Sequence, residues 1–267
     1  MGRRNVTRYG MAFPIETLQQ VQGFFWIFLR VGVLFFLLPF FGARNIPTLW
    51  KAGLTVVTSL VLFPVVPPPP AFPQTILEVI MGIASEVLMG FVLALGVKML
   101  LAAVELAGQF MGFQMGFNMA SAMDPETGGQ STVISQFLYL FTVLIFFSVN
   151  GHHMFIRALA ASFYKVPPDS FHLNAPLVGA LVKVSSEMFV IALKMAAPIM
   201  VALFLSNVCL GVVARTVPQV NVLMIGLPLN IFLGMILFSM VLLNLSPLLE
   251  DLVHKIGEAL LGMLQMM

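Results

Sequence analysis

Residues 76–120 read ILEVIMGIASEVLMGFVLALGVKMLLAAVELAGQFMGFQMGFNMA, an apolar run about twice as long as a usual membrane span. A bilayer core of roughly 30 Å needs about 20 helical residues. The run also contains Glu78, Glu86, Lys98 and Glu105, and charged side chains are expensive in hydrocarbon. We therefore expect a long helix sheltered by other parts of the protein, rather than one simple helix exposed to lipid.

The composition of the whole chain points the same way. Of its 267 residues, 60% are hydrophobic and only 9% are charged, which leaves too little polar surface to cover a water-soluble globule. The apolar runs are long and unbroken, whereas the strands of a transmembrane barrel alternate over roughly ten residues. We therefore predict an all-α, polytopic integral membrane protein, with membrane lipid as its main solvent.

Compared with the length of about 20 residues that a membrane-spanning helix needs, the chain divides into six apolar segments, some of them overlong. Pro198 in the fifth and Pro228 in the sixth predict broken helices. We treat 1–267 as a single membrane domain, in which about 20 residues precede the first helix. The segments are Val21–Phe41, Ala52–Val66, Ile76 to about Ala120, Val133–Val149, Leu177–Val217 and Val222–Leu245.

An amphipathic helix is predicted at 246–267. Ser246-Pro247 suits the start of a helix. Acidic residues outnumber Lys255 in this segment, so attraction to anionic lipid is poor, and we expect a partner protein as its docking surface. The apolar face of this helix consists of Leu249, Leu252, Val253, Ile256 and Leu260.

Several other classes of protein are disfavoured by the residues present. The single cysteine, Cys209, lies in an apolar stretch, where we expect it to be a small buried packing residue. His152 and His153 are neighbours that point about 100° apart on a helix, which does not suit one metal ion. The basic residues are scattered, so nucleic acid is not an expected partner. Without a recognisable catalytic motif, we expect neither a cofactor nor enzymatic activity.

The end of the quoted run repeats a small residue, an aromatic residue and a methionine at every fourth position. Small residues at this spacing line one helix face and let another backbone approach closely; here they are Gly108, Gly112, Gly116 and Ala120. Methionine is deformable, so a stripe of it can close around a hole and later repack; the stripe is Met111, Met115, Met119 and Met123. Two interpretations stay open: a tightly packed helix, or a gate beside the hydrophilic loop that follows.

Charged residues within the apolar segments form a second group of candidates. Inside a membrane such residues face protein or water. We favour pairing between helices or between subunits over a proton or substrate relay, because interfaces that bury helices also shelter charge. For Arg215, near a helix end before Pro218, contact with terminal carbonyl groups is the first interpretation and a role in an interface the second. The group consists of Arg30, Glu86, Lys98, Glu105, Glu187, Lys194 and Arg215.

Two stretches resemble the signature regions of the FliR/SctT family. The first is GFQMGF at 112–117, with Asp124-Pro125 downstream. The second is ARTVPQVN at 214–221, which leads to GLP at 226–228. The length of the chain, the order of its hydrophobic segments and both motifs agree with the family over the whole chain. The chain resembles the flagellar branch of the family more than the injectisome branch.

This resemblance implies a single-copy subunit of a helical FliP–FliQ–FliR assembly, through which unfolded flagellar proteins leave the cytoplasm. It also implies the bacterial inner membrane and the flagellum basal body as the location, with FlhB-type and FlhA-type export components as further partners. The family's gate sits partly beyond the bilayer, so some apolar segments need not be spans.

The resemblance also assigns a role to the repeat at the end of the quoted run. In the family, the matching region closes the channel as a plug. Gly112 and Gly116 would supply backbone freedom. The plug itself would consist of Phe113, Met115, Phe117 and Met119.

A secondary transporter is the main alternative. In that reading, Pro198 and Pro228 break helices around a midplane site that contains Glu187 and Lys194. Such proteins usually have related halves, and the sequence shows no internal repeat. An intramembrane enzyme is a third class, and the chain lacks its chemistry.

Overall fold

The structure, a computed structural model, describes most of the chain. The described residues are 18–38, 47–67, 73, 75–117, 132–167, 171, 174–217 and 221–266. Within these ranges the regular elements are all helices, so the predicted all-α fold is confirmed. In chain order they are α1 (Leu18–Leu37), α3 (Thr48–Leu62), α4 (Ile76–Met115), α6 (Val133–Ser148), α7 (Gly151–Lys165), α8 (Ala175–Thr216), α9 (Val222–Leu243) and α10 (Leu245–Met266).

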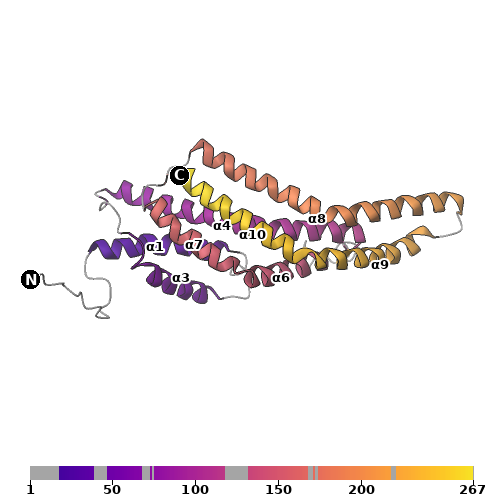
Figure 1. The fold of residues 1–267 in the computed structure, drawn as a ribbon, viewed down its shortest axis with the longest axis horizontal. Coiled ribbons are helices and arrows are strands. Elements are labelled where there is room, and N and C mark those ends of the chain that lie inside the picture. The colour runs from indigo at the N-terminus through magenta and orange to yellow at the C-terminus, as the bar shows by residue number, and fades with distance from the viewer. Residues whose placement is uncertain are drawn as a thin grey trace, which may run out of the picture.

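Helix α4 runs through the middle of the bundle (Figure 1). Its start is fixed by Thr75, whose side chain accepts a hydrogen bond from the Glu78 backbone N–H at 3.3 Å, as an N-cap does. Because α1, α6, α8, α9 and α10 all contact it, side chains on several of its faces are buried, among them Met89, Leu93 and Val104. The expectation that this long segment is sheltered by other parts of the protein is confirmed.

Two pairs of shorter helices lie beside α4, and one member of each pair, α1 or α6, packs on it. Helices α1 and α3 lie against each other, and Gly32 of α1 faces the methyl group of Thr55 of α3. Helices α6 and α7 follow one another with a bend of 67°. The bend falls at Asn150, whose φ of 58° lies in the left-handed region, which asparagine tolerates better than most residues. The chain therefore changes direction here without a long loop.

Helices α8 and α9 are continuous, so the prediction of broken helices was wrong. Helix α8 extends over 42 residues with Pro198 inside it, and α9 extends over 22 residues with Pro228 inside it. A proline removes one backbone hydrogen bond and bends a helix, but a membrane helix tolerates this where neighbouring groups satisfy the freed carbonyl. Figure 1 shows α8 as one long helix that changes direction partway along its length.

Not all of the six predicted apolar segments are candidate membrane spans, which agrees with the expectation that some of them need not cross the bilayer. Among the described residues, four helices are long and apolar enough to cross a membrane: α1, α4, α8 and α9. The bent pair α6–α7 makes a fifth if it crosses as one unit. Helix α3 has only 15 residues, or about 22 Å at 1.5 Å per residue, which is short for a bilayer core of roughly 30 Å.

Helix α10 docks on its own chain, which corrects the expectation of a partner protein as its docking surface. Its apolar face packs against α4, α6, α7, α8 and α9. Leu249, Leu252, Val253 and Leu260 are all buried there. A methyl group on Gly96 of α4 would lie 2.8 Å from Leu260 Cδ2, so the glycine lets α10 approach α4 closely.

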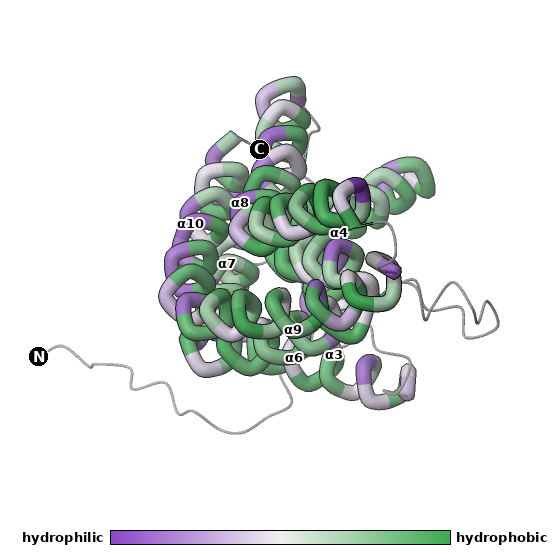
Figure 2. Tube along the Cα trace, turned by 90° about the vertical axis from the view of Figure 1, so that its right-hand side faces the viewer, coloured by the Kyte–Doolittle hydropathy of each residue, from purple (hydrophilic) through white to green (hydrophobic). Residues whose placement is uncertain are grey.

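The outer face of α10 is hydrophilic. Glu250, Asp251, Lys255 and Glu258 are exposed on it, and Lys255 Nζ lies 2.6 Å from Asp251 Oδ2. The hydrogen bond that Lys255 donates to the Asp251 carboxylate raises the pKa of Lys255 above its ordinary value. Figure 2 shows hydrophilic stretches along α10 at one side of the molecule, whereas α6 and α9 are mostly coloured as hydrophobic.

Candidate functional site

The glycine face of α4 lies directly on the start of α6. A methyl group on Gly108 would lie 2.5 Å from Ser135 Cα, and one on Gly112 would lie 2.5 Å from Thr132 Oγ1. Thr132 is the N-cap of α6: its hydroxyl accepts from the Ser135 backbone N–H at 3.1 Å and donates to the Gly108 carbonyl at 3.3 Å. Only glycine fits at these two positions, so the small residues here make a close helix–helix contact.

Gly116 ends helix α4 with a Schellman motif. Its φ of 90° is left-handed, a conformation that glycine adopts without strain. The Gly116 N–H donates to the Phe113 carbonyl at 3.1 Å, and the Phe117 N–H donates to the Gly112 carbonyl at 3.0 Å, the pair of bonds that defines the motif. The first signature region is therefore the last turn of α4 followed by a fixed stop.

The structure places the proposed plug residues in different environments. The Phe113 side chain is 68% exposed, whereas Met115 is fully buried. Met115 packs on Gly234 of α9, where a methyl group would lie 2.6 Å from Met115 Cγ. Phe117 is partly buried against the core. The later members of the repeat, Met119, Ala120 and Met123, lie outside the described residues.

Helix geometry explains this separation. Residues two positions apart on a helix point to nearly opposite sides, so Phe113 and Met115 cannot line one surface while this turn of α4 stays helical. Sequence reasoning grouped them because they belong to one motif. It missed the contact of Met115 with Gly234 of α9, because no local pattern links residues so far apart in the chain.

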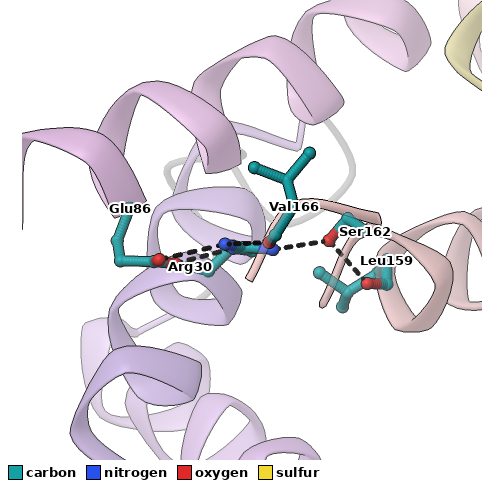
Figure 3. A network of polar contacts seen from close by, with 5 residues as sticks. All are labelled: Arg30, Glu86, Leu159, Ser162 and Val166. Atoms are coloured by element: carbon teal, nitrogen blue, oxygen red, sulfur yellow. Dashed lines mark hydrogen bonds and ion pairs between the residues drawn. The ribbon is translucent and has the colours of Figure 1, made fainter. Parts of the chain in front are cut away.

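A buried ion pair joins three helices at the other end of α4 (Figure 3). Arg30 of α1 donates to both carboxylate oxygens of Glu86, from Nε at 2.6 Å and from Nη2 at 2.9 Å. It also donates to the Ser162 hydroxyl of α7 at 3.0 Å and to the Val166 carbonyl at 3.2 Å. The guanidinium carbon lies 4.2 Å from the centre of the Phe163 ring. Arg30 and Glu86 have no exposed surface.

This geometry satisfies the buried charges from several directions. Two ions lose a large hydration energy when they are buried, and only close, well-directed contacts compensate for it. The paired bonds between guanidinium and carboxylate are the strong kind, and the Phe163 ring adds a favourable cation–π contact. Arg30 and Glu86 therefore fix the relative positions of α1, α4 and α7.

The other charged candidates are not buried in this chain. Lys98, Glu187, Lys194 and Arg215 are exposed, and Glu105 is half-buried. Pairing between helices of the chain is thus observed for Arg30 with Glu86, and burial of the others against a second subunit stays a prediction. Cys209 is also exposed, which corrects the expectation of a buried packing residue.

The site proposed for the transporter alternative is not present in this arrangement. Helices α8 and α9 continue through Pro198 and Pro228, so neither presents helix ends to a ligand. Glu187 lines a small open pocket between α4, α8 and α10. Lys194 is exposed on α8 and does not line this pocket. Among the described residues, no three His, Cys, Asp or Glu side chains come together to hold a metal ion.

These features define a class: an all-helical membrane protein built around one long, glycine-packed helix. Residues 21–256 match the model of the family described as bacterial export proteins, family 1. The chain belongs to this family, which bears out the resemblance stated above.

Individual relatives cover most of the chain. The flagellar biosynthetic protein FliR of Bacillus subtilis is 38% identical over 218 residues, which is 80% of this chain and 83% of that protein. The protein of the same name from Pectobacterium carotovorum is 29% identical over 252 residues, 93% of this chain and 95% of that protein. The one from Escherichia coli is 28% identical over 245 residues, 92% and 94% respectively.

Replacing Gly108 with alanine should destabilise the protein. The added methyl group would meet the Ser135 backbone, which cannot rotate away, and such overpacking typically costs about 1–3 kcal/mol. The measurement is unfolding in mixed micelles, followed by circular dichroism at 222 nm. Gly211→Ala is the matched control, because no atom lies within 4 Å of the added methyl group in α8. Equal stability of the two variants would contradict the close contact between α4 and α6.

Removing one member of the buried ion pair should destabilise the protein more than replacing both members with apolar residues. Glu86→Gln leaves Arg30 buried without its counter-ion, and the loss of one partner typically costs about 3–5 kcal/mol. The double variant Arg30→Met, Glu86→Met should lose less stability than Glu86→Gln in the same micelle titration, because no charge stays buried. Lys98→Met, an exposed position on the same helix, is the control. A Glu86→Gln variant as stable as the control would contradict this account.

Proposed function

We propose that this chain is a subunit of the flagellar protein export gate. In this proposal it forms, with FliP and FliQ, a channel through which unfolded flagellar proteins cross the bacterial inner membrane at the flagellum basal body. The observation that carries the proposal is the family match over 21–256, together with relatives named flagellar biosynthetic protein FliR. FlhB-type and FlhA-type export components are the further partners we expect.

The exposed surface supports a role within a larger membrane assembly. Phe189, Phe204 and Phe232 are each more than half exposed on α8 and α9. Such a surface needs lipid or other helices to cover it. The exposed charges Lys98 and Glu187 on the same bundle also call for polar groups or water around them. A subunit that lies in lipid and is completed by neighbouring subunits meets both needs.

We propose Phe113 as the blocking residue of the gate and Met115 as its anchor. Phe113 projects from the last turn of α4, and a large apolar ring in a narrow passage excludes water and thereby ions. Met115 packs on Gly234 inside the chain, where it holds the end of α4 against α9. Gly116 contributes the fixed helix end and Gly112 the contact with α6, rather than general flexibility.

Deleting the gene in the bacterium that carries this chain tests the proposal. The deletion should abolish swimming and the secretion of flagellar proteins into the medium, and a plasmid copy should restore both. Purification of the tagged chain in mild detergent, followed by mass analysis, should recover it with smaller helical subunits. A chain that purifies alone, from cells that still secrete flagellar proteins after the deletion, would contradict the proposal.

Within the assembled gate, Phe113→Ala should increase ion conductance severalfold, because the passage loses its largest apolar obstacle. The measurement is single-channel current across a planar bilayer. Phe189→Ala, which removes another exposed ring away from the end of α4, should leave the conductance unchanged. Met115→Ala should instead reduce the yield of assembled gate, since its side chain is buried. Unchanged conductance in a fully assembled Phe113→Ala gate would refute the assignment of the plug.

A further inference from the structure

The α8–α9 hairpin contains a long stretch without charge. Residues 195–214 of α8 read MAAPIMVALFLSNVCLGVVA, and α9 (Val222–Leu243) also contains no charged residue. The stretch in α8 is bounded by Lys194 and Arg215. These two residues are separated by about 31 Å at 1.5 Å per residue, close to the roughly 30 Å of a bilayer's hydrocarbon core.

The protein covers little of this hairpin. Within the most apolar 18-residue stretch of each helix, 61% of α4 is buried inside the protein, compared with 28% of α8 and 17% of α9. Large apolar side chains of α8 recur on its exposed side at helical spacing, and they are Val201, Phe204, Leu205, Val208 and Val212. This side of α8 therefore presents a continuous apolar face at the end of the molecule where α9 also lies (Figure 1).

The polar side chains within the same stretch bond to one another. Asn230 of α9 donates to the Asn207 side-chain carbonyl at 2.7 Å and accepts from the Ser206 hydroxyl at 3.3 Å. Polar groups surrounded by hydrocarbon are found in such interhelical bonds. The hairpin thus holds its polar groups in contacts between its own helices and leaves the apolar face uninterrupted.

Charge returns at both limits of this stretch. Lys194 and Arg215 are exposed, and long cationic side chains at the ends of a span extend toward the lipid headgroups. Beyond Lys194, the first part of α8 carries the exposed residues Lys183 and Glu187, and α10 presents its hydrophilic outer face nearby (Figure 2). The uncharged stretch of α8 is therefore bounded by an exposed cation at each limit.

We propose that residues 195–214 of α8 and helix α9 are the part of the protein that contacts the acyl chains of the bilayer. Lys194 and Arg215 then lie in opposite headgroup layers, and the first part of α8, with the outer face of α10, projects beyond the membrane. Lipid is favoured over a partner helix because a protein interface does not require an uncharged length equal to the hydrocarbon thickness with a cation at each limit. This inference does not depend on the export function.

The protein carries its own probe for this proposal. Cys209 is the single cysteine of the chain and is exposed within the uncharged stretch. It lies six positions from Arg215, or about 9 Å along the helix, which places it inside the hydrocarbon. A nitroxide label on Cys209 of the full chain, purified with its bound subunits and returned to phosphatidylethanolamine and phosphatidylglycerol vesicles, reports its surroundings by electron paramagnetic resonance.

Collisions of this label with oxygen should be frequent and collisions with water-soluble nickel chelate rare, with an oxygen-to-nickel ratio severalfold above that of a label on α10. The α10 control is Glu258→Cys in a Cys209→Ser background, because Glu258 lies on the hydrophilic face. In the same background, Leu205→Cys should give a higher ratio than Val213→Cys, since residue 205 lies near the midpoint between the two cations.

Two other outcomes would overturn the proposal. Frequent nickel collisions at Cys209 would place this face in water. Rare collisions with both reagents would show that a neighbouring subunit covers it. Neither outcome affects the gene-deletion test of the export function, so failure of one proposal can be told from failure of the other.

Discussion

The close approach of neighbouring helices to α4 is the constraint on which the rest of the structure depends. Lipid is as apolar as a leucine side chain, so burial of apolar surface gives helices in a membrane little reason to associate, and close packing must do so instead. Along α4, glycines meet α1 at Gly90, α10 at Gly96 and α6 at Gly108 and Gly112. At each position a methyl group would lie within 2.8 Å of an atom of the partner helix.

The buried ion pair follows from this packing. Gly90 lies one turn beyond Glu86, and a methyl group there would lie 2.8 Å from the Arg30 carbonyl oxygen. Because α1 comes this near, the Arg30 guanidinium reaches both oxygens of Glu86. In a low-dielectric interior, attraction between the two charges is strong but desolvation is costly. The pair therefore contributes mainly to specificity: it favours the one arrangement of α1, α4 and α7 in which both charges are satisfied.

Features of the structure that depend on a local sequence pattern could be predicted from the sequence. Features that depend on contacts between residues far apart in the chain could not. Long apolar runs were enough for the all-α membrane fold, and spacing by four was enough for the helical glycine face. The partner of α10 was not predictable, because its apolar face fits a partner protein and its own chain equally well. The pairing of Arg30 with Glu86 joins residues 56 positions apart. Phe113 and Met115 lie in different environments because the last turn of α4 is helical, and the motif alone does not show this.

The end of α4 also constrains how the proposed gate opens. Gly108 and Gly112 sit against Ser135 and Thr132 with no space to slide, so the body of α4 cannot shift along α6 without a clash. Beyond Gly112, the tight contacts of this end are with side chains rather than backbone: Met115 lies on Gly234, and Gly116 lies against the Leu227 side chain. Such side chains, methionine above all, repack at small cost. Motion is therefore easiest in the single turn that ends at Gly116. Gly116 meets Leu227 and Met115 meets Gly234, both in α9, so this turn lies beside the uncharged α8–α9 hairpin. If the hairpin lies in hydrocarbon, the proposed plug lies at the depth of the bilayer. A seal against ions is needed at that depth.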